Sequence, residues 1–122
     1  MIRYAGEDLG GHPRIAILGS AKLGNFIVTT PLLRGLKERF PDSVVDFYGS
    51  PVNRAFEAAC PWVDWRMDIF PAAPDRLASI AGALAERTGG EGYDLVVNCD
   101  GFNPYTTALA PLLNPRFVAG NT

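Results

Sequence analysis

Residues 14–25 read RIAILGSAKLGN, a short apolar run that ends at a glycine and continues into small and polar residues. An apolar run of this length between turn residues is typical of a strand buried on both faces of a parallel sheet. The next apolar residues recur at helical spacing with charged residues between them: Leu32, Leu33, Leu36 and Phe40. This order of strand, loop and helix predicts an α/β fold.

The same alternation continues along the chain. Strands are predicted at 44–49, 64–70, 93–98 and 117–119, and helices at 53–60, from 74 to 88, and at 106–113. Parallel strands need crossovers of about a dozen residues, which these helices supply. We predict a doubly wound, mostly parallel, five-stranded Rossmann-like sheet over residues 14–122, after a flexible leader at residues 1–13.

Composition narrows the protein class. The 122 residues suit one domain, and 48% hydrophobic with 20% charged residues excludes a disordered chain. The net charge of −2 argues against non-specific nucleic-acid binding. No apolar run approaches the ~20 residues of a membrane span, and the start lacks the apolar core of a secretory signal. The sequence therefore predicts a cytoplasmic protein without a transmembrane segment.

Few residues are available for metal or thiol chemistry. Cys60, Cys99 and His12 are the only cysteines and the only histidine, too few for a structural zinc site. His12 stands in the glycine-rich leader, which disfavours a Cys–His or Ser–His pair. We expect no metal site and no cofactor.

Ligands of doubly wound sheets bind beyond the carboxyl ends of the strands, where the strand order reverses. The loops after Leu18 and after Asn98 are expected to meet there. Residues 19–26 lack the Lys-Ser/Thr of a P-loop and contain no G-x-G-x-x-G. A small-residue loop that leads into a helix suits an anion or a hydroxyl, although Gly24 and Asn25 could serve only a turn and a helix cap. Thr30-Pro31 is an equally good helix start.

Residues 24–37, GNFIVTTPLLRGLK, resemble the opening of the heptosyltransferase-like glycosyltransferases (family 9). Residues 40–47, 61–64, 93–98 and 100–101 also resemble that family in order and spacing. The resemblance implies the N-terminal half of the two-domain GT-B architecture, with the C-terminal donor domain absent from this chain. It implies inverting transfer of a heptose or related sugar from a nucleotide-sugar to a lipopolysaccharide-type, lipid-linked or other glycan acceptor, at the inner membrane face or in the cytoplasm.

This chain departs from the family at the catalytic base. The family has Leu-Gly-Asp where this chain has Asn25, and an amide cannot accept a proton at neutral pH. Asp100 stands where the family shows another residue, so we expect Asp100 to act as base while Asn25 positions the acceptor. The alternative is that Asp100 belongs only to an Asp-Gly turn. The residues expected to contact the acceptor are Ser20, Lys22, Gly24 and Gly101.

Other interpretations stay open. The chain alone is expected to be inactive, and a non-catalytic sugar- or partner-binding remnant is a second function. A flavodoxin- or receiver-like domain is a third, although residues 19–21 lack the acidic pair of a receiver. Trp62 and Trp65 could stack on sugar rings or pack the edge of the core. The basic residues Arg34, Lys37 and Arg39 suit a solvated helix face or an anionic membrane surface.

Overall fold

A parallel sheet forms the middle layer of the computed structural model, which describes residues 2–100 and 103–120. Within these residues the sheet has six strands in the order β1-β6-β5-β2-β3-β4, and every pairing is parallel. The strands are β1 (Ile2–Arg3), β2 (Arg14–Leu18), β3 (Val44–Gly49), β4 (Trp65–Asp68), β5 (Tyr93–Asn98) and β6 (Pro115–Gly120). The predicted doubly wound α/β class is confirmed.

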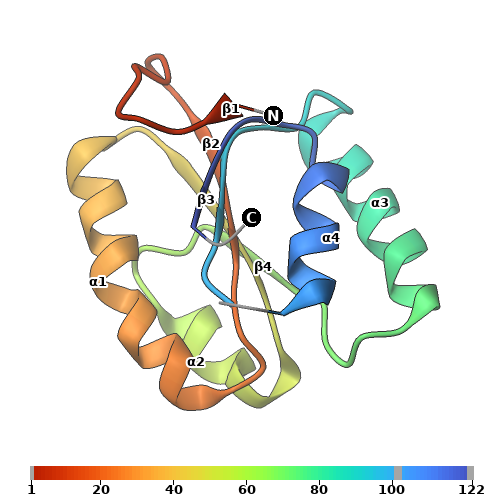
Figure 1. The fold of residues 1–122 in the computed structure, drawn as a ribbon. Coiled ribbons are helices and arrows are strands. Elements are labelled where there is room, and N and C mark those ends of the chain that lie inside the picture. The colour runs from red at the N-terminus through yellow and green to blue at the C-terminus, as the bar shows by residue number, and fades with distance from the viewer. Residues whose placement is uncertain (1, 101–102, 121–122) are drawn as a thin grey trace.

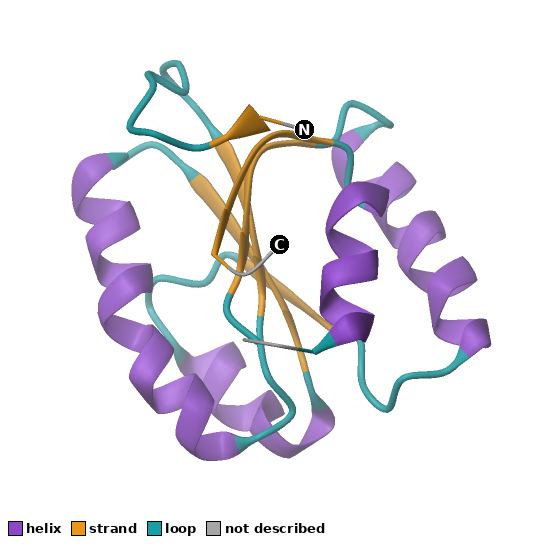
Figure 2. Ribbon diagram, in the orientation of Figure 1, coloured by secondary structure: helices purple, strands orange, loops and turns teal. Residues whose placement is uncertain are grey.

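Helices cover both faces of the sheet. They are α1 (Leu23–Arg39), the 3₁₀ turn η1 (Pro51–Asn53), α2 (Arg54–Ala59), α3 (Pro74–Thr88) and α4 (Pro104–Leu112). In Figure 2 they form two groups on opposite sides of the strands, α1 with α2 and α3 with α4. Two buried apolar clusters fill the two interfaces, and the β2 residues Ile15 to Leu18 between them have no exposed surface.

The strand order reverses between β2 and β5. From β2 the chain builds outward through β3 to β4, then returns so that β5 pairs with the other edge of β2 (Figure 1). Leu18 lies opposite Asn98 in the register, and the Cys99 N–H donates to the Leu18 carbonyl at 2.9 Å. The loops after these two strands therefore begin side by side, at the carboxyl edge of the sheet.

Helix α1 begins at Leu23, upstream of both starts that the sequence suggests, and it contains Pro31. Proline has no N–H, so the Ile27 carbonyl loses its usual helical donor. The Thr30 hydroxyl donates to that carbonyl at 2.7 Å and replaces the missing bond. The helix therefore continues through Thr30-Pro31, which looked like a cap in the sequence.

The leader contributes to the sheet, which is why the prediction of five strands is one short. Ile2–Arg3 pairs with β6, and the Tyr4 ring meets Phe117 edge-on with centroids 5.9 Å apart. Leu9 is buried against the α1 side of the sheet. These contacts attach residues 2–9 to the sheet, whereas the composition of this segment predicts a flexible leader.

Several element boundaries differ from the prediction by one to three residues; the strand expected at 117–119, for example, covers Pro115–Gly120. The strand expected at 64–70 covers only Trp65–Asp68, and the helix expected from Thr106 begins at Pro104. The Asn103 side chain accepts a hydrogen bond from the Tyr105 N–H at 3.0 Å, which satisfies a free donor of the first turn of α4. Within the described ranges, no helix is long and apolar enough to cross a membrane.

Candidate functional site

Ser20 closes the loop between β2 and α1. Its hydroxyl oxygen accepts the Lys22 N–H at 3.1 Å and the Asn25 side-chain amide at 3.0 Å, and only 6% of the residue is exposed. The Gly19 N–H donates to the Tyr48 carbonyl at 2.8 Å, which ties the loop to the end of β3. Ser20 therefore sets the loop conformation from beneath, and its expected contact with an acceptor stays a prediction.

A second set of polar groups holds the same loop from the side of η1. The fully buried Asn53 side chain donates to the Ser20 carbonyl at 3.4 Å and to the Lys22 carbonyl at 3.3 Å. The Ser50 hydroxyl donates to the Ala21 carbonyl at 3.4 Å. Nothing in the sequence pattern identifies Asn53. Ser50 could have been found, because a polar residue directly after a buried strand is a usable signal.

Replacing Gly19 with alanine is expected to lower the free energy of unfolding by about 1–3 kcal/mol, the usual cost of overpacking. A Cβ at Gly19 would lie 2.6 Å from the Phe47 ring. Gly24→Ala is the matched control, because a Cβ there meets nothing within 4 Å and alanine favours the helix. Urea unfolding measures both variants, and equal stability of the two would contradict the close packing at Gly19.

Asn25 lies in the first turn of α1, where it is exposed. Its side-chain amide nitrogen is fixed by Ser20, and no donor among the described residues reaches its Oδ1. A carbonyl oxygen held in this way can accept a hydrogen bond from a hydroxyl, but it cannot take up the proton. Lys22, at the N-cap of α1, and Gly24 are exposed beside it.

Asp100 follows β5 and is half-buried. Its N–H donates to Asn98 Oδ1 at 3.1 Å, and its Oδ2 accepts the Asn103 side-chain amide at 2.7 Å. Its Oδ1 has no hydrogen-bond partner in residues 2–100 and 103–120. Asn103 orients one oxygen of Asp100, and its N–H donates to the Asp100 carbonyl at 3.0 Å, so this geometry fits both the base and the turn residue that the sequence suggests. Gly101, expected to contact the acceptor, lies outside the described residues.

The candidate site combines these two loops. Lys22, Gly24 and Asn25 lie in and just after the loop that leaves β2, and Asp100 lies just after the neighbouring strand β5. Ligands of doubly wound sheets bind at this reversal. The edge carries a cation, an amide held by Ser20 and a carboxylate held by Asn103, which are groups that can hydrogen-bond a polar hydroxyl compound.

A buried ion network supports the same edge from β3 and β4. Glu57 is fully buried, and its carboxylate accepts Arg66 Nε at 2.8 Å and the Ser50 N–H at 3.3 Å. Arg66 also pairs with Asp68, which in turn pairs with Arg54. Burial raises the pKa of Glu57, whereas Asp68 is partly buried and its hydrogen bonds to Arg66 and Arg54 leave its pKa below the usual value. The charged residues that interrupt the predicted strand at 64–70 belong to this network.

Thiol chemistry does not fit this site. Burial raises the pKa of Cys99 to about 11, so the residue is a thiol at neutral pH. His12 precedes β2, whereas Cys99 follows the parallel strand β5, which puts them at opposite edges of the sheet. Among the described residues, no three His, Cys, Asp or Glu side chains are grouped to hold a metal ion.

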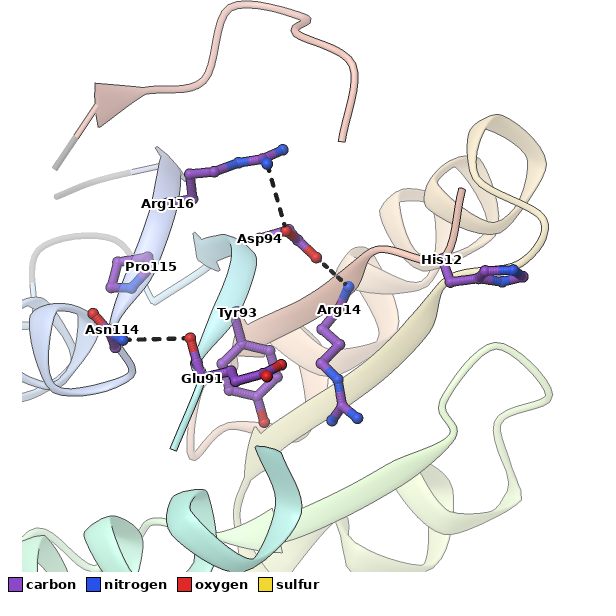
Figure 3. Close-up of a pocket in the computed structure, with 9 residues that line it drawn as sticks. His12, Arg14, Glu91, Tyr93, Asp94, Asn114, Pro115 and Arg116 are labelled. Carbon is purple, nitrogen blue, oxygen red and sulfur yellow. Dashed lines mark hydrogen bonds and ion pairs between the residues drawn. The ribbon is translucent and has the colours of Figure 1, made fainter. Parts of the chain in front are cut away.

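A cavity of about 440 Å³ opens at the other, amino edge of the sheet (Figure 3). Asp94 accepts the Arg14 N–H at 2.9 Å, and one of its oxygens lies 3.9 Å from Arg116. The Arg14 guanidinium donates to the Arg87 carbonyl at 2.9 Å. Asp94 therefore links β5 to β2 and lies near Arg116 of β6, while the Arg14 and Arg116 side chains also donate to the backbone carbonyls of Arg87 and Asp8.

The basic residues of α1 also have partners. Arg34 pairs with Glu38 at 2.9 Å, and Arg39 donates to the Gly6 carbonyl at 3.0 Å. Lys37 donates to the Ser43 carbonyl and to Asp64, each at 2.6 Å, so it ties the end of α1 to the sheet. Lys37 is thus part of the fold rather than of a fully solvated face.

No protein-family model and no curated protein matches this sequence. Several solved structures, including the following two, are similar to it. A glycosyl transferase family 9 protein from Veillonella parvula DSM 2008 gives a TM-score of 0.71 at 21% identity, over 87% of this chain and 31% of that chain. ADP-heptose LPS heptosyltransferase II from E. coli gives 0.63 at 21% identity, over 83% and 28%. The chain spans less than a third of either protein, and the resemblance drawn from the sequence is confirmed at the level of the fold.

Proposed function

We propose that this chain is the acceptor-binding half of an inverting glycosyltransferase, which moves a heptose or related sugar from a nucleotide-sugar to a lipopolysaccharide-type or other glycan acceptor. The observation that carries the proposal is the position of Asn25 and Asp100 beyond neighbouring strands at the reversal of strand order. The fold similarity to two sugar transferases supports it. The donor is a substrate, and neither a metal nor a cofactor takes part.

In this mechanism Asp100 acts as the general base. Its Oδ1 takes the proton of the acceptor hydroxyl while Asn103 holds Oδ2. The acceptor oxygen forms a bond to the anomeric carbon from the face opposite the nucleotide, and the bond to the leaving phosphate oxygen breaks with its electron pair. Asn25 Oδ1 accepts a hydrogen bond from a neighbouring hydroxyl of the acceptor sugar and so orients the reacting hydroxyl toward Asp100. General-base catalysis of this kind is worth about 10²–10⁴-fold.

Asn25 also favours a second function, a non-catalytic sugar- or partner-binding protein. An amide stands where the resembling family has its base, so binding would persist without transfer if Asp100 does not replace that base. In both functions the glycan meets the same edge, and only the first requires proton transfer by Asp100.

Isothermal titration of the 122-residue chain tests the proposal. A deacylated lipopolysaccharide inner-core oligosaccharide is expected to bind, and nucleotide-sugars are not, because the donor site belongs to the other half. Lys22→Gln is expected to weaken binding of the anionic oligosaccharide about two- to fivefold, the effect of one exposed charge, whereas Arg116→Gln at the amino edge leaves it unchanged. Micromolar binding of a nucleotide-sugar, or no binding of the oligosaccharide, would contradict the assignment.

A further inference from the structure

Helix α1 carries a groove on its outer surface, away from the loops described above. The groove has a volume of about 270 Å³ and is lined by Thr30, Pro31, Arg34, Gly35, Glu38 and Trp62. Along α1 the lining residues run from Thr30 to Glu38, which lie about 8 to 20 Å beyond Asn25 at 1.5 Å per residue. The groove is therefore separate from the carboxyl edge of the sheet.

Gly35 is one of the residues that line the groove, and the fold does not require a glycine there. Its backbone is helical, and a Cβ at this position would meet nothing within 4 Å. Glycine in the interior of a helix is less favourable than alanine, so the packing offers no compensation for it. What the missing side chain does provide is open space beside Trp62.

The two walls differ in chemistry. Thr30, Arg34 and Glu38 lie four residues apart and so form one row along the helix. Arg34 Nε donates to Glu38 Oε1 at 2.9 Å, which leaves the other guanidinium N–H groups and the second carboxylate oxygen available. Trp62 stands opposite, half-buried against the core on the α1 side of the sheet. Its indole N–H donates to no group within the described part of the chain.

We infer that this groove binds a single neutral pyranose ring. An indole offers an apolar face to the C–H side of a sugar and one N–H donor at its edge. The Arg34–Glu38 pair supplies donors and acceptors for hydroxyls with no net charge, which disfavours a phosphate or carboxylate. The volume of about 270 Å³ lies just below the about 300–1,000 Å³ of pockets for drug-sized ligands, which suits one ring.

The test is an NMR titration of the 122-residue chain with the methyl glycosides of glucose, galactose and mannose, read at the two indole N–H signals. Trp62→Phe and Trp65→Phe assign the signals. At least one glycoside is expected to shift the Trp62 signal with a millimolar dissociation constant and to leave the Trp65 signal in place. Gly35→Leu adds a side chain to the lining of the groove and is expected to weaken binding at least tenfold.

Gly82→Leu is the matched control, because Gly82 is also an exposed helical glycine with nothing within 4 Å of a Cβ. It is expected to change the affinity less than twofold. The inference is overturned if none of the three glycosides shifts Trp62 at up to about 0.1 M, or if glucose 6-phosphate binds tighter than the neutral glucoside. A Trp62 shift that depends on protein concentration without sugar would also overturn it, since the groove would then hold a second copy of the chain.

Discussion

Replacing Asp100 with asparagine in the complete glycosyltransferase to which we assign this chain is expected to lower kcat by about 10²–10⁴-fold, the usual contribution of a general base. The KM for the acceptor should change little, because an asparagine can still hydrogen-bond the hydroxyl and Asn103 still has an oxygen to bind. Steady-state kinetics at saturating donor measure the two constants separately.

Two further variants show whether the effect belongs to this position. Asn25→Asp in the Asp100→Asn background is expected to restore part of kcat, because it returns a carboxylate to the edge of the site. Asp42→Asn makes the same chemical change at an exposed aspartate beyond the other end of α1 and is expected to have no effect. Near-normal turnover of Asp100→Asn would discard Asp100 as the base and leave the non-catalytic function.

Replacing Arg66 with methionine is expected to lower the free energy of unfolding at neutral pH by about 3–5 kcal/mol, because it leaves the charge of Glu57 buried without its partner. Glu57 has no exposed surface and lies against Gly49, where an added Cβ would come within 2.1 Å of its carboxylate. Arg34→Met breaks an ion pair whose side chains are 65% and 66% exposed, and is expected to cost less than about 1 kcal/mol.

The loss in Arg66→Met should shrink as the pH falls. Burial already raises the pKa of Glu57, and removal of Arg66 raises it further. A carboxyl whose pKa is raised in the folded state favours that state below its unfolded pKa of about 4.3, and this contribution is lost as the pH rises through the folded pKa. Arg66 also helps to keep the pKa of Asp68 below its usual value, and this contribution to stability is present only above the unfolded pKa of Asp68. Its loss in Arg66→Met therefore also shrinks as the pH falls.

Urea unfolding of Arg66→Met and wild type at about pH 4.5 and pH 7 measures this dependence. Adding Glu57→Gln to Arg66→Met should recover most of the stability at neutral pH, because a neutral amide is cheaper to bury than an unpaired carboxylate. A loss that is equal at both pH values, or a double variant no better than Arg66→Met, would show that the charge of Glu57 is not the cause.

The sequence predicts the sheet well because buried parallel strands leave continuous apolar runs, such as residues 14–18 and 93–98. It fails where a segment depends on distant contacts. Ile2–Arg3 becomes a strand only through β6, and no local pattern reports that pairing. Helix α1 continues past Pro31 with the Thr30 hydroxyl bonded to the Ile27 carbonyl, a detail that composition cannot show.

At the candidate site, the sequence identifies the candidate residues but not the hydrogen-bond partners that hold them in place. Asn25 and Asp100 could be proposed from their positions after two apolar runs, and the topology brings those positions to one edge. Asn53 and Glu57 act from other elements on the loop of Ser20 and on Arg66, so these contacts become visible only when the strands are placed. Asn103 acts locally, three residues after Asp100, and its role depends on the side-chain geometry at the start of α4.

The most direct test is an NMR titration of the isotope-labelled chain with the inner-core oligosaccharide, read at the backbone amide signals. It shows whether the acceptor binds at the carboxyl edge of the sheet, beyond β2 and β5. We expect the largest shifts at the amide signals of Lys22, Asn25 and Asp100, with little change at the amino-edge residues His12 and Glu91. Saturable binding that shifts the amino edge and leaves Asn25 and Asp100 unmoved would contradict it.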